Sequence, residues 1–300
     1  MIIAITGPTG VGKTKLSVAL AKKYHGIVVN CDAMQVYKGM DIGTAKIKEE
    51  EKEGVTHYLF DIVSPEVNYT VYDYQKDARK IIEENKDKTI IFVGGTGLYL
   101  KAALFDYRFS EEESKETYEE YNNEELYQMC LKKDETCLIH PNNRRRMIRF
   151  LQKETTTLVE PKLLYDNTIF IGLTTNREHL YEIIDKRVDK MFEEGLLEEV
   201  KKFYEQHLNS KALQTAIGYK ELYSYFEGNL SLEETKELIK KNSRHYAKRQ
   251  YTFFNHQLPV QWFPVNYEDF QKTIEEVSSF IEKQAVQCQV VLVEPKTNEM

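Results

Sequence analysis

Short apolar runs alternate with amphipathic stretches through the first hundred residues. We predict strands near 2–6, 27–31 and 89–93, helices near 13–24 and 71–85, and a weaker strand at 58–63. Strands that alternate with helices are typical of a mostly parallel sheet that helices cover. The first third of the chain therefore predicts an α/β fold.

The pattern changes after residue 107. Residues 108–165 contain little strand signal, and they begin with Ser110 and three glutamates, a capping box that indicates the start of a helix. The rest of the chain predicts strands at 168–173 and 260–263 and helices at 177–206 (one, or two broken at Gly195), 212–227, 231–255 and 266–283. We therefore expect a core of 1–107 and 166–284, a helical insertion of 108–165 and a flexible tail of 285–300.

A glycine-rich loop joins the first strand to the first helix and matches G-x-x-x-x-G-K-S/T, the phosphate-binding loop. Its backbone N–H groups and the helix N-terminus can hold phosphate oxygens, Lys13 can reach the terminal phosphate, and the Thr14 hydroxyl can bind Mg²⁺. The flanking strand and helix disfavour the alternative of an ordinary turn. We expect all eight loop residues to surround an anion: Gly7, Pro8, Thr9, Gly10, Val11, Gly12, Lys13 and Thr14. A sheet like that of the P-loop NTPases is thus predicted.

Composition excludes several classes of protein. Hydrophobic residues make up 41% and charged residues 30%, as in a soluble globular protein. No run approaches the roughly 18 apolar residues of a membrane span, and the N-terminus does not resemble a signal peptide. The four cysteines form no C-x-x-C pair, so we expect reduced thiols in a cytoplasmic protein.

The net charge of −7 argues against a protein that binds nucleic acid non-specifically. Basic residues nevertheless cluster at 144–153 and 240–249. A local patch, rather than the total charge, decides whether an anionic polymer can bind.

Two further segments follow strands and therefore face the same edge of the sheet as the phosphate loop. Asp32 can bind Mg²⁺, act as a general base or cap a turn. Residues 94–97, Gly-Gly-Thr-Gly, either let a ligand approach the backbone beside the Thr96 hydroxyl or form a tight turn. No acidic residue ends the strand at 89–93, which weakens a phosphoryl-transfer interpretation, since such enzymes usually place a metal-binding Asp there.

Arg187 lies within the apolar stripe of the helix at 177–206. An unpaired charge on such a surface costs several kcal/mol, so Arg187 should meet an anion. A diphosphate suits its guanidinium fork, and a buried salt bridge is the alternative.

Two helices carry basic residues. Arg145, Arg146 and Arg149 share one side of a helix and predict either a surface for a phosphate backbone or a solvated face. The second helix repeats basic residues every four positions and ends in aromatic ones: Lys240, Arg244, Lys248, then Lys241, His245, Arg249, then Tyr251, Phe253, Phe254. These aromatic rings either stack on a base or belong to the core.

Together these motifs resemble the tRNA dimethylallyltransferases, also called tRNA isopentenyl-diphosphate transferases. The resemblance extends to about residue 283 and rests on the order of seven segments: 7–14, 31–46, 94–99, 140–146, 187–189, 216–220 and 248–250. Relative to the family pattern, Ala33 replaces a usual Ser, Phe253 a frequent Trp and Asn255 a frequent Arg.

The family transfers a dimethylallyl group from its diphosphate to N6 of the adenosine 3′ of the anticodon. The resemblance implies that the phosphate loop holds dimethylallyl diphosphate, that Asp32 is the general base and that Thr96 places the reacting base. It also implies that Arg187, Lys13 and Mg²⁺ on Thr14 stabilise the departing diphosphate. The implied tRNA contacts are Asp32, Ala33, Met34, Gln35, Arg145, Arg146, Arg149, Gly218, Tyr219, Lys220, Lys248, Arg249 and Gln250.

We thus expect a cytoplasmic monomer that binds the anticodon stem-loop of tRNA and no membrane. Three alternatives remain open at this point: a prenyltransferase of free adenine nucleotides, a small-molecule kinase, and a non-catalytic RNA-binding module.

Overall fold

The computed structural model describes residues 1–109, 118–152 and 161–291. Its contacts divide the chain into a core unit, Met1–Phe105 with Leu163–Met300, and an insertion unit, Asp106–Lys162. The insertion expected at 108–165 falls largely on the second unit. The capping box expected at Ser110 lies outside the described residues.

The core unit is built on one parallel sheet of six strands in the order β3-β2-β4-β1-β5-β6. These strands are β1 (Ile2–Thr6), β2 (Ile27–Asn30), β3 (His57–Tyr58), β4 (Ile90–Val93), β5 (Thr168–Thr174) and β6 (Gln261–Pro264). In this register Ile5 lies beside Val93 on one side and Ile171 on the other. The predicted parallel sheet flanked by helices is confirmed.

The strand expected at 58–63 is wrong beyond Tyr58. Leu59 and Asp61 have positive φ angles of 64° and 52°, which a continuous strand cannot contain. Only His57–Tyr58 pairs with β2, and Val63 instead forms an isolated bridge with Tyr37.

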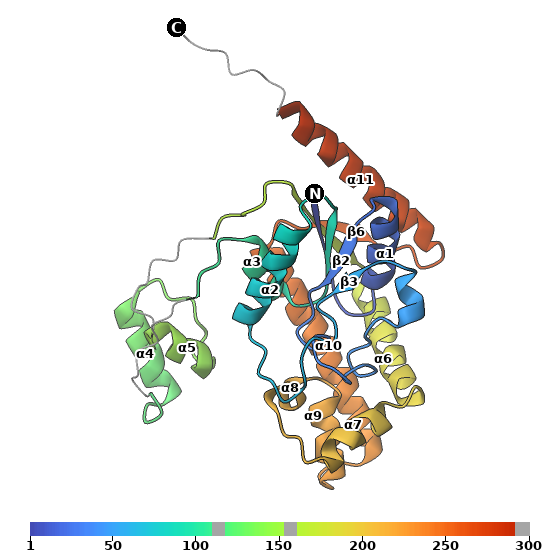
Figure 1. The fold of residues 1–300 in the computed structure, drawn as a ribbon. Helices are drawn as coiled ribbons and strands as arrows, with labels where there is room; N and C mark the ends of the chain where they lie inside the picture. The colour runs from blue at the N-terminus through green and yellow to red at the C-terminus, as the bar shows by residue number, and fades with distance from the viewer. Residues whose placement is uncertain (110–117, 153–160, 292–300) are drawn as a thin grey trace. The chain divides into compact units, whose positions relative to one another are not determined.

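Helices cover both faces of the sheet (Figure 1). They are α1 (Lys13–Lys23), α2 (Val71–Glu84), α3 (Gly97–Leu104), α6 (Arg177–Glu193) and α11 (Phe270–Val291). Successive side chains of a strand point to opposite faces, so Ala4 packs in a cluster with Tyr74 of α2, whereas Ile5 packs in a cluster with Leu16 of α1. A short 3₁₀ turn, Glu49–Lys52, lies between β2 and β3.

A further group of helices follows α6, namely α7 (Leu196–Glu205), α8 (Lys211–Thr215), α9 (Tyr219–Phe226) and α10 (Leu232–Gln257). They form a separate buried cluster with the loop after β2, in which Val36 and Met40 meet Leu196, Tyr219 and Ile239. The segment that follows Asp32 therefore has a core of its own.

Glycines end two of the predicted helices. The helix at 177–206 is broken at Gly195, which has φ 101°, so the second of the two expected forms is correct. The single helix expected at 212–227 is wrong, because Gly218, with φ 96°, separates α8 from α9. Part of the expected tail is also wrong: α11 continues to Val291, since no glycine or proline interrupts the sequence before Pro295.

The insertion unit contains α4 (Asn123–Lys133) and α5 (Arg144–Gln152) around a small core of Leu126, Cys130 and Met147. Asn122 caps α4 by accepting hydrogen bonds from two backbone N–H groups. Arg144 donates to the carbonyls of Tyr118, Glu119 and Tyr121 and therefore holds the unit together. The predicted basic face remains exposed: Arg145, Arg146 and Arg149.

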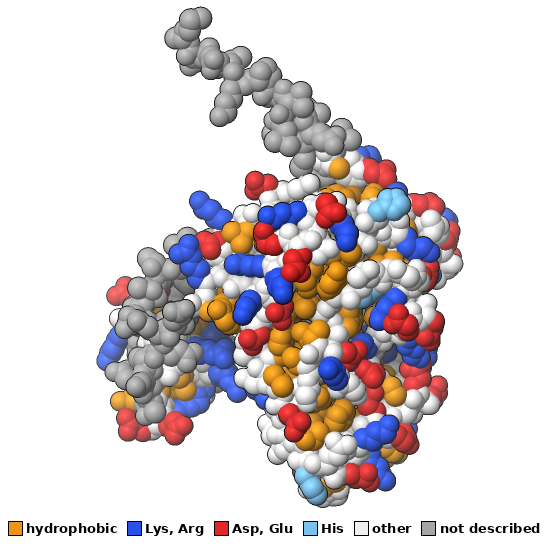
Figure 2. Space-filling model, in the orientation of Figure 1, with side chains coloured by type: hydrophobic (Ala, Val, Ile, Leu, Met, Phe, Trp, Pro, Cys, Tyr) orange, Lys and Arg blue, Asp and Glu red, His pale blue; other side chains and the backbone are white. Residues whose placement is uncertain are grey.

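Acidic and basic side chains are intermixed on the face of the core unit that Figure 2 shows, with apolar side chains between them. This face carries no continuous basic field, as the net charge of −7 suggests. Within the described ranges, none of the helices combines the length and apolar character that crossing a membrane requires.

Candidate active site

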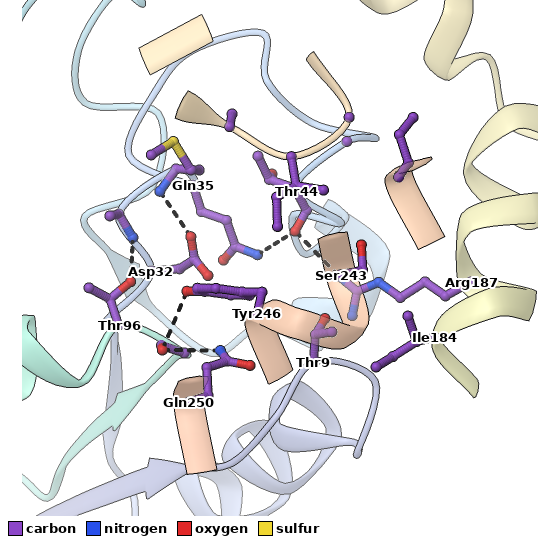
Figure 3. A pocket seen from close by; sticks show the side chains of 18 of the residues that line it. Thr9, Asp32, Gln35, Thr44, Thr96, Ile184, Arg187, Ser243, Tyr246 and Gln250 are labelled. Carbon is purple, nitrogen blue, oxygen red and sulfur yellow. Dashed lines mark hydrogen bonds between the residues drawn. The ribbon is translucent and has the colours of Figure 1, made fainter. Parts of the chain in front are cut away.

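A cavity of about 290 Å³ lies where the strands β1, β2 and β4 end. Its walls come from the loops that follow these strands, from α6 and α10, and from the turn between α8 and α9 (Figure 3). Open parallel sheets bind their ligands at this edge, because the loops there converge from several strands. All residues that line the cavity belong to the core unit.

The phosphate loop leaves β1 and enters α1 through glycines in the left-handed region. Gly10 and Gly12 have φ angles of 88° and 87°, and a Cβ at either would meet Ile183 at 2.7 Å or Phe270 at 2.6 Å. Of the loop's residues, Thr9 and Lys13 line the cavity. Pro8 and Val11 are buried, and the Thr14 side chain is exposed. The loop can thus meet an anion through its backbone and two side chains.

Two cationic side chains, Lys13 and Arg187, face the cavity. Burial and, to a smaller extent, the charge of Arg187 lower the pKa of Lys13 to about 7, against the opposing effect of Asp32. Burial also lowers the pKa of Arg187, against the attraction of Asp32. Nζ of Lys13 donates to the Pro8 carbonyl at 2.6 Å, and Nη2 of Arg187 donates to the Thr44 carbonyl at 3.5 Å.

Arg187 forms no ion pair within 4.0 Å among the described residues, so the buried salt bridge proposed as its alternative is not observed there. Among the described residues no carboxylate pairs with either of these two half-buried cations, which leaves their charges uncompensated by the protein. The arrangement fits a ligand that carries more than one negative charge.

Asp32 combines two of the roles that the sequence left open. Its Oδ1 accepts from the Met34 N–H at 2.9 Å, so it caps the turn after β2, and its side chain also lines the cavity (Figure 3). The buried Asn30 holds Asp32 in place, because its amide accepts from the Asp32 N–H and donates to the Asp32 carbonyl. Oγ1 of Thr96 accepts from the Ala33 N–H at 3.0 Å and so ties the two loops together.

Of the two alternatives expected for the glycines at 94–97, the structure shows the tight turn, in which these glycines pack closely against other parts of the protein. A Cβ at Gly94 would overlap the Cys31 backbone, one at Gly95 would overlap Gln250, and one at Gly97 would overlap Phe253. The protein itself therefore occupies the space that these glycines leave. The turn interpretation is correct, although Gly94 and Gly95 still line the cavity.

Helix α10 supplies two polar side chains that reach the Gly95 carbonyl. Nε2 of Gln250 donates to it at 3.1 Å and the Tyr246 hydroxyl at 3.5 Å (Figure 3). The Oε1 atom of Gln250 is buried and has no partner among the described residues. Burial, together with the Asp32 charge, raises the pKa of Tyr246, so it stays a neutral phenol. Sequence reasoning missed Tyr246. It could have been predicted because it lies one helical turn before Gln250 and therefore on the same face of the helix.

Two of the basic residues on α10 form ion pairs with carboxylates of the protein itself, contrary to our expectation that they bind phosphates. Lys240 pairs with Asp189 at 2.9 Å, and Arg244 pairs with both oxygens of Asp185 at 2.5 and 2.7 Å. These pairs join α10 to α6. The exposed basic side chains of this helix are Lys241, His245, Lys248, Arg249 and His256, of which Arg249 lines the cavity.

The aromatic residues that follow belong to the core, which was the second of the two alternatives that the sequence left open for them. Phe254 is fully buried, and Phe253 packs in the same cluster. The Tyr251 hydroxyl is within hydrogen-bond distance of Thr174 Oγ1 at 2.8 Å, and its ring lies against Trp262.

The turn between α8 and α9 borders the cavity through Gly218 and Lys220, but the Tyr219 side chain is fully buried. Its hydroxyl donates to Glu199 at 2.5 Å. The expected direct contact of this side chain with RNA is therefore not supported. Sequence reasoning also missed Glu199, which looks like one more surface acid on an amphipathic helix.

The family model described as IPP transferase matches residues 35–257. This chain belongs to the IPP transferase family. The tRNA dimethylallyltransferase of Anoxybacillus flavithermus is 46% identical over 94% of this chain and 96% of that protein. The enzyme of the same name from Bacillus subtilis is 44% identical over 91% and 95%.

Solved structures agree with this IPP transferase assignment. The full-length tRNA isopentenylpyrophosphate transferase of Bacillus halodurans shares 42% identity at a TM-score of 0.79, covering 98% of this chain and 99% of that one. A eukaryotic dimethylallyltransferase acting on tRNA shares 30% identity at a TM-score of 0.77, covering 99% and 81%. The family predicted from the motifs is confirmed.

Proposed function

We propose that this chain transfers the dimethylallyl group of dimethylallyl diphosphate to N6 of the adenosine 3′ of the anticodon in tRNA. One observation carries the proposal: a single cavity holds two cations that lack a bound carboxylate and, facing them, the carboxylate of Asp32. In the reaction the allylic C–O bond breaks, the N6–C bond forms, diphosphate leaves, and Asp32 accepts the N6 proton.

The diphosphate occupies the end of the cavity formed by the phosphate loop. Backbone N–H groups after Gly10, the Thr9 hydroxyl and the charges of Lys13 and Arg187 surround it there. Negative charge grows on the leaving group as the C–O bond lengthens, so fixed cations stabilise the transition state more than the ground state.

The adenine occupies the end formed by Asp32 and Thr96. One carboxylate oxygen already caps the turn, which orients Asp32 and leaves its second oxygen for the amine proton. Gln250 lines the cavity, and its Oε1, which has no partner in the described part of the chain, offers an acceptor suited to an exocyclic amine. To enter this space the adenosine leaves the base stack, as in other enzymes that modify a base.

We propose Mg²⁺ as the cofactor. No group of three or more His, Cys, Asp or Glu residues in the described part of the chain could hold a metal by itself. The exposed Thr14 hydroxyl at the start of α1 fits an ion that binds mainly to diphosphate oxygens and water, as Mg²⁺ usually does. When bound, such an ion neutralises charge on the leaving diphosphate.

The proposed tRNA contacts fall into two groups. Ala33, Met34, Gln35, Gly218, Lys220, Arg249 and Gln250 line the cavity and would surround the flipped nucleotide. Lys248 on α10 and Arg145, Arg146 and Arg149 on α5 are exposed and would contact phosphates of the anticodon stem-loop. We further propose a cytoplasmic monomer.

The main alternative is a prenyltransferase of free adenine nucleotides, which would share the cavity. The exposed basic residues outside the cavity favour a polymeric acceptor, because a mononucleotide has no second phosphate to reach them. A kinase is disfavoured by the glycine, rather than an acidic residue, that follows β4.

Transfer of label from radioactive dimethylallyl diphosphate tests the proposal, with unmodified tRNA and AMP as competing acceptors and Mg²⁺ present. We expect label in tRNA at the nucleotide 3′ of the anticodon. Asp32→Asn should reduce the single-turnover rate at least about 100-fold, the usual scale for a lost general base, while pyrophosphate still binds. Label in AMP alone, or full activity of Asp32→Asn, would refute the proposed substrate or mechanism respectively.

A further inference from the structure

The carboxylate of Glu199, on α7, accepts four hydrogen bonds. Its Oε2 accepts from the backbone N–H groups of Asp41 and Ile42 at 3.1 and 2.8 Å. Its Oε1 accepts from the Gly43 N–H at 3.1 Å and from the Tyr219 hydroxyl at 2.5 Å. Three successive N–H groups of one loop thus converge on a single side chain more than 150 positions away.

Loss of these four hydrogen bonds would be energetically unfavourable. Successive N–H groups that point the same way form a concave site for an anion, and charged acceptors bind them more strongly than neutral ones do. Burial and the Glu199 charge raise the pKa of Tyr219, so the phenol remains a neutral donor to the carboxylate. The loop at 41–43 therefore takes its position from Glu199.

The same loop continues directly into the cavity wall. Gly43 and Thr44 line the cavity, and the Thr44 carbonyl accepts from Gln35 Nε2 at 3.0 Å and from Arg187 Nη2 at 3.5 Å (Figure 3). These are the only hydrogen-bonding contacts that join this carbonyl to side chains in the described residues. The position of the Thr44 carbonyl thus helps to fix the position of the Arg187 guanidinium group.

A second clamp fixes the opposite side of the loop. Nζ of Lys46, whose side chain is 5% exposed, donates to the Tyr37 carbonyl at 2.7 Å and to carboxylates of Asp41 and Asp61 at 2.7 and 2.5 Å. Lys46 thus holds the side chain of Asp41, and Glu199 holds the backbone of residues 41–43.

We infer that Glu199 is a positioning residue that sets Arg187 for the diphosphate through the backbone of the loop at 41–44. The inference rests on the proposed function for the identity of the ligand. It assigns a role to an acidic residue that never touches the substrate. It also explains why Tyr219 faces α7 rather than the cavity.

The test compares Glu199→Gln with Glu198→Gln, a matched change at the neighbouring, exposed position of α7. A glutamine at 199 places an N–H₂ group against backbone donors, so we expect it to weaken binding of inorganic pyrophosphate about tenfold, the scale of one charged hydrogen bond. The amides at 41–43 should exchange hydrogen faster in the same variant. Glu198→Gln should match the wild type in both measurements.

A double-mutant cycle with Arg187→Met separates positioning from general destabilisation. Because the inferred route passes through Arg187, Glu199→Gln should change pyrophosphate binding less than twofold in the Arg187→Met background. An undiminished tenfold effect there would overturn the inference. So would a Glu199→Gln protein that binds pyrophosphate and protects its amides like the wild type.

If Glu199→Gln does not fold, Tyr219→Phe decides the question, since it removes one hydrogen bond to Glu199 and little volume. We expect weaker pyrophosphate binding and faster exchange at 41–43, and wild-type behaviour in both would overturn the inference. Failure of the proposed function looks different: the wild type would bind pyrophosphate but transfer no prenyl group to tRNA.

Discussion

Replacing Gly95 with alanine would place a methyl group in space that Gln250 occupies. Gln250 is only 4% exposed, so its amide cannot swing into solvent to make room. The substitution should therefore break the hydrogen bond from Gln250 Nε2 to the Gly95 carbonyl. No positive φ is involved at Gly95, so the expected cost comes from packing and hydrogen bonding alone.

The magnitude follows from three terms. Leaving the buried carbonyl and amide unpaired costs about 1–3 kcal/mol. Forcing the glutamine off its rotamer adds about 0.5–1.5 kcal/mol. The lower entropy of an unfolded chain with alanine returns about 0.5–1 kcal/mol. We thus expect the free energy of unfolding to fall by about 0.5–4 kcal/mol.

Urea denaturation followed by the fluorescence of Trp262 measures this value, because the chain's one tryptophan lies in the core unit. Gln250→Ala serves as the partner in a double-mutant cycle, since it removes the atoms that the new methyl group would strike. The double variant should therefore be no less stable than Gln250→Ala alone. Effects that add within about 0.5 kcal/mol would refute the reasoning, because independent sites behave that way.

The remaining predictions concern ligands. Arg187→Met should weaken pyrophosphate binding about tenfold or more in calorimetry, and an unchanged affinity would contradict its proposed role. In metal-free protein, pyrophosphate binding should take up a proton at pH 8, because the free Lys13 has a pKa of about 7 and the bound anion raises that pKa. The affinity for pyrophosphate should therefore fall as the pH rises above about 7. Lys13→Arg should abolish the proton uptake. Thr14→Val should raise the Mg²⁺ concentration for half-maximal activity about tenfold, whereas chelation of the metal should stop turnover. Removing Arg145 and Arg146 together should lower the slope of log affinity for tRNA against log salt by about two, and an unchanged slope would exclude them as phosphate contacts.

The fold was predictable from the sequence where local signals sufficed. The apolar runs and the phosphate loop located β1, β2, β4 and β5, because a parallel strand buried on both faces is apolar throughout. The end of the strand at Tyr58 was not predictable, since the run that follows it is equally apolar and its positive φ angles depend on tertiary contacts. The break between α8 and α9 was not predictable either, because the φ of 96° at Gly218, just before α9, carries no sequence signal beyond the glycine itself.

Individual residues of the candidate site were predictable from the sequence, but the ion pairs and hydrogen bonds between them were not. Asp32 was predicted because it follows a strand at the ligand-binding edge of the sheet, and Arg187 because it is a charge within the apolar stripe of a helix. Lys240 and Arg244 looked equally available on the helical wheel, and only the packing of α6 against α10 shows that carboxylates of α6 neutralise them. Glu199 could not be found, because three of its four partners are backbone groups that carry no sequence signal.

The chain leaves the core unit and returns to it at neighbouring points. Phe105 bridges Leu163 in antiparallel fashion, and the Leu164 N–H donates to the Leu104 carbonyl at 2.9 Å. The two segments that connect the insertion unit to the core unit are thus hydrogen-bonded to each other, so the length of the inserted sequence does not alter the path of the strands in the core. Evolution can consequently enlarge, trim or exchange the insertion unit while the sheet and the cavity of the core unit keep their positions.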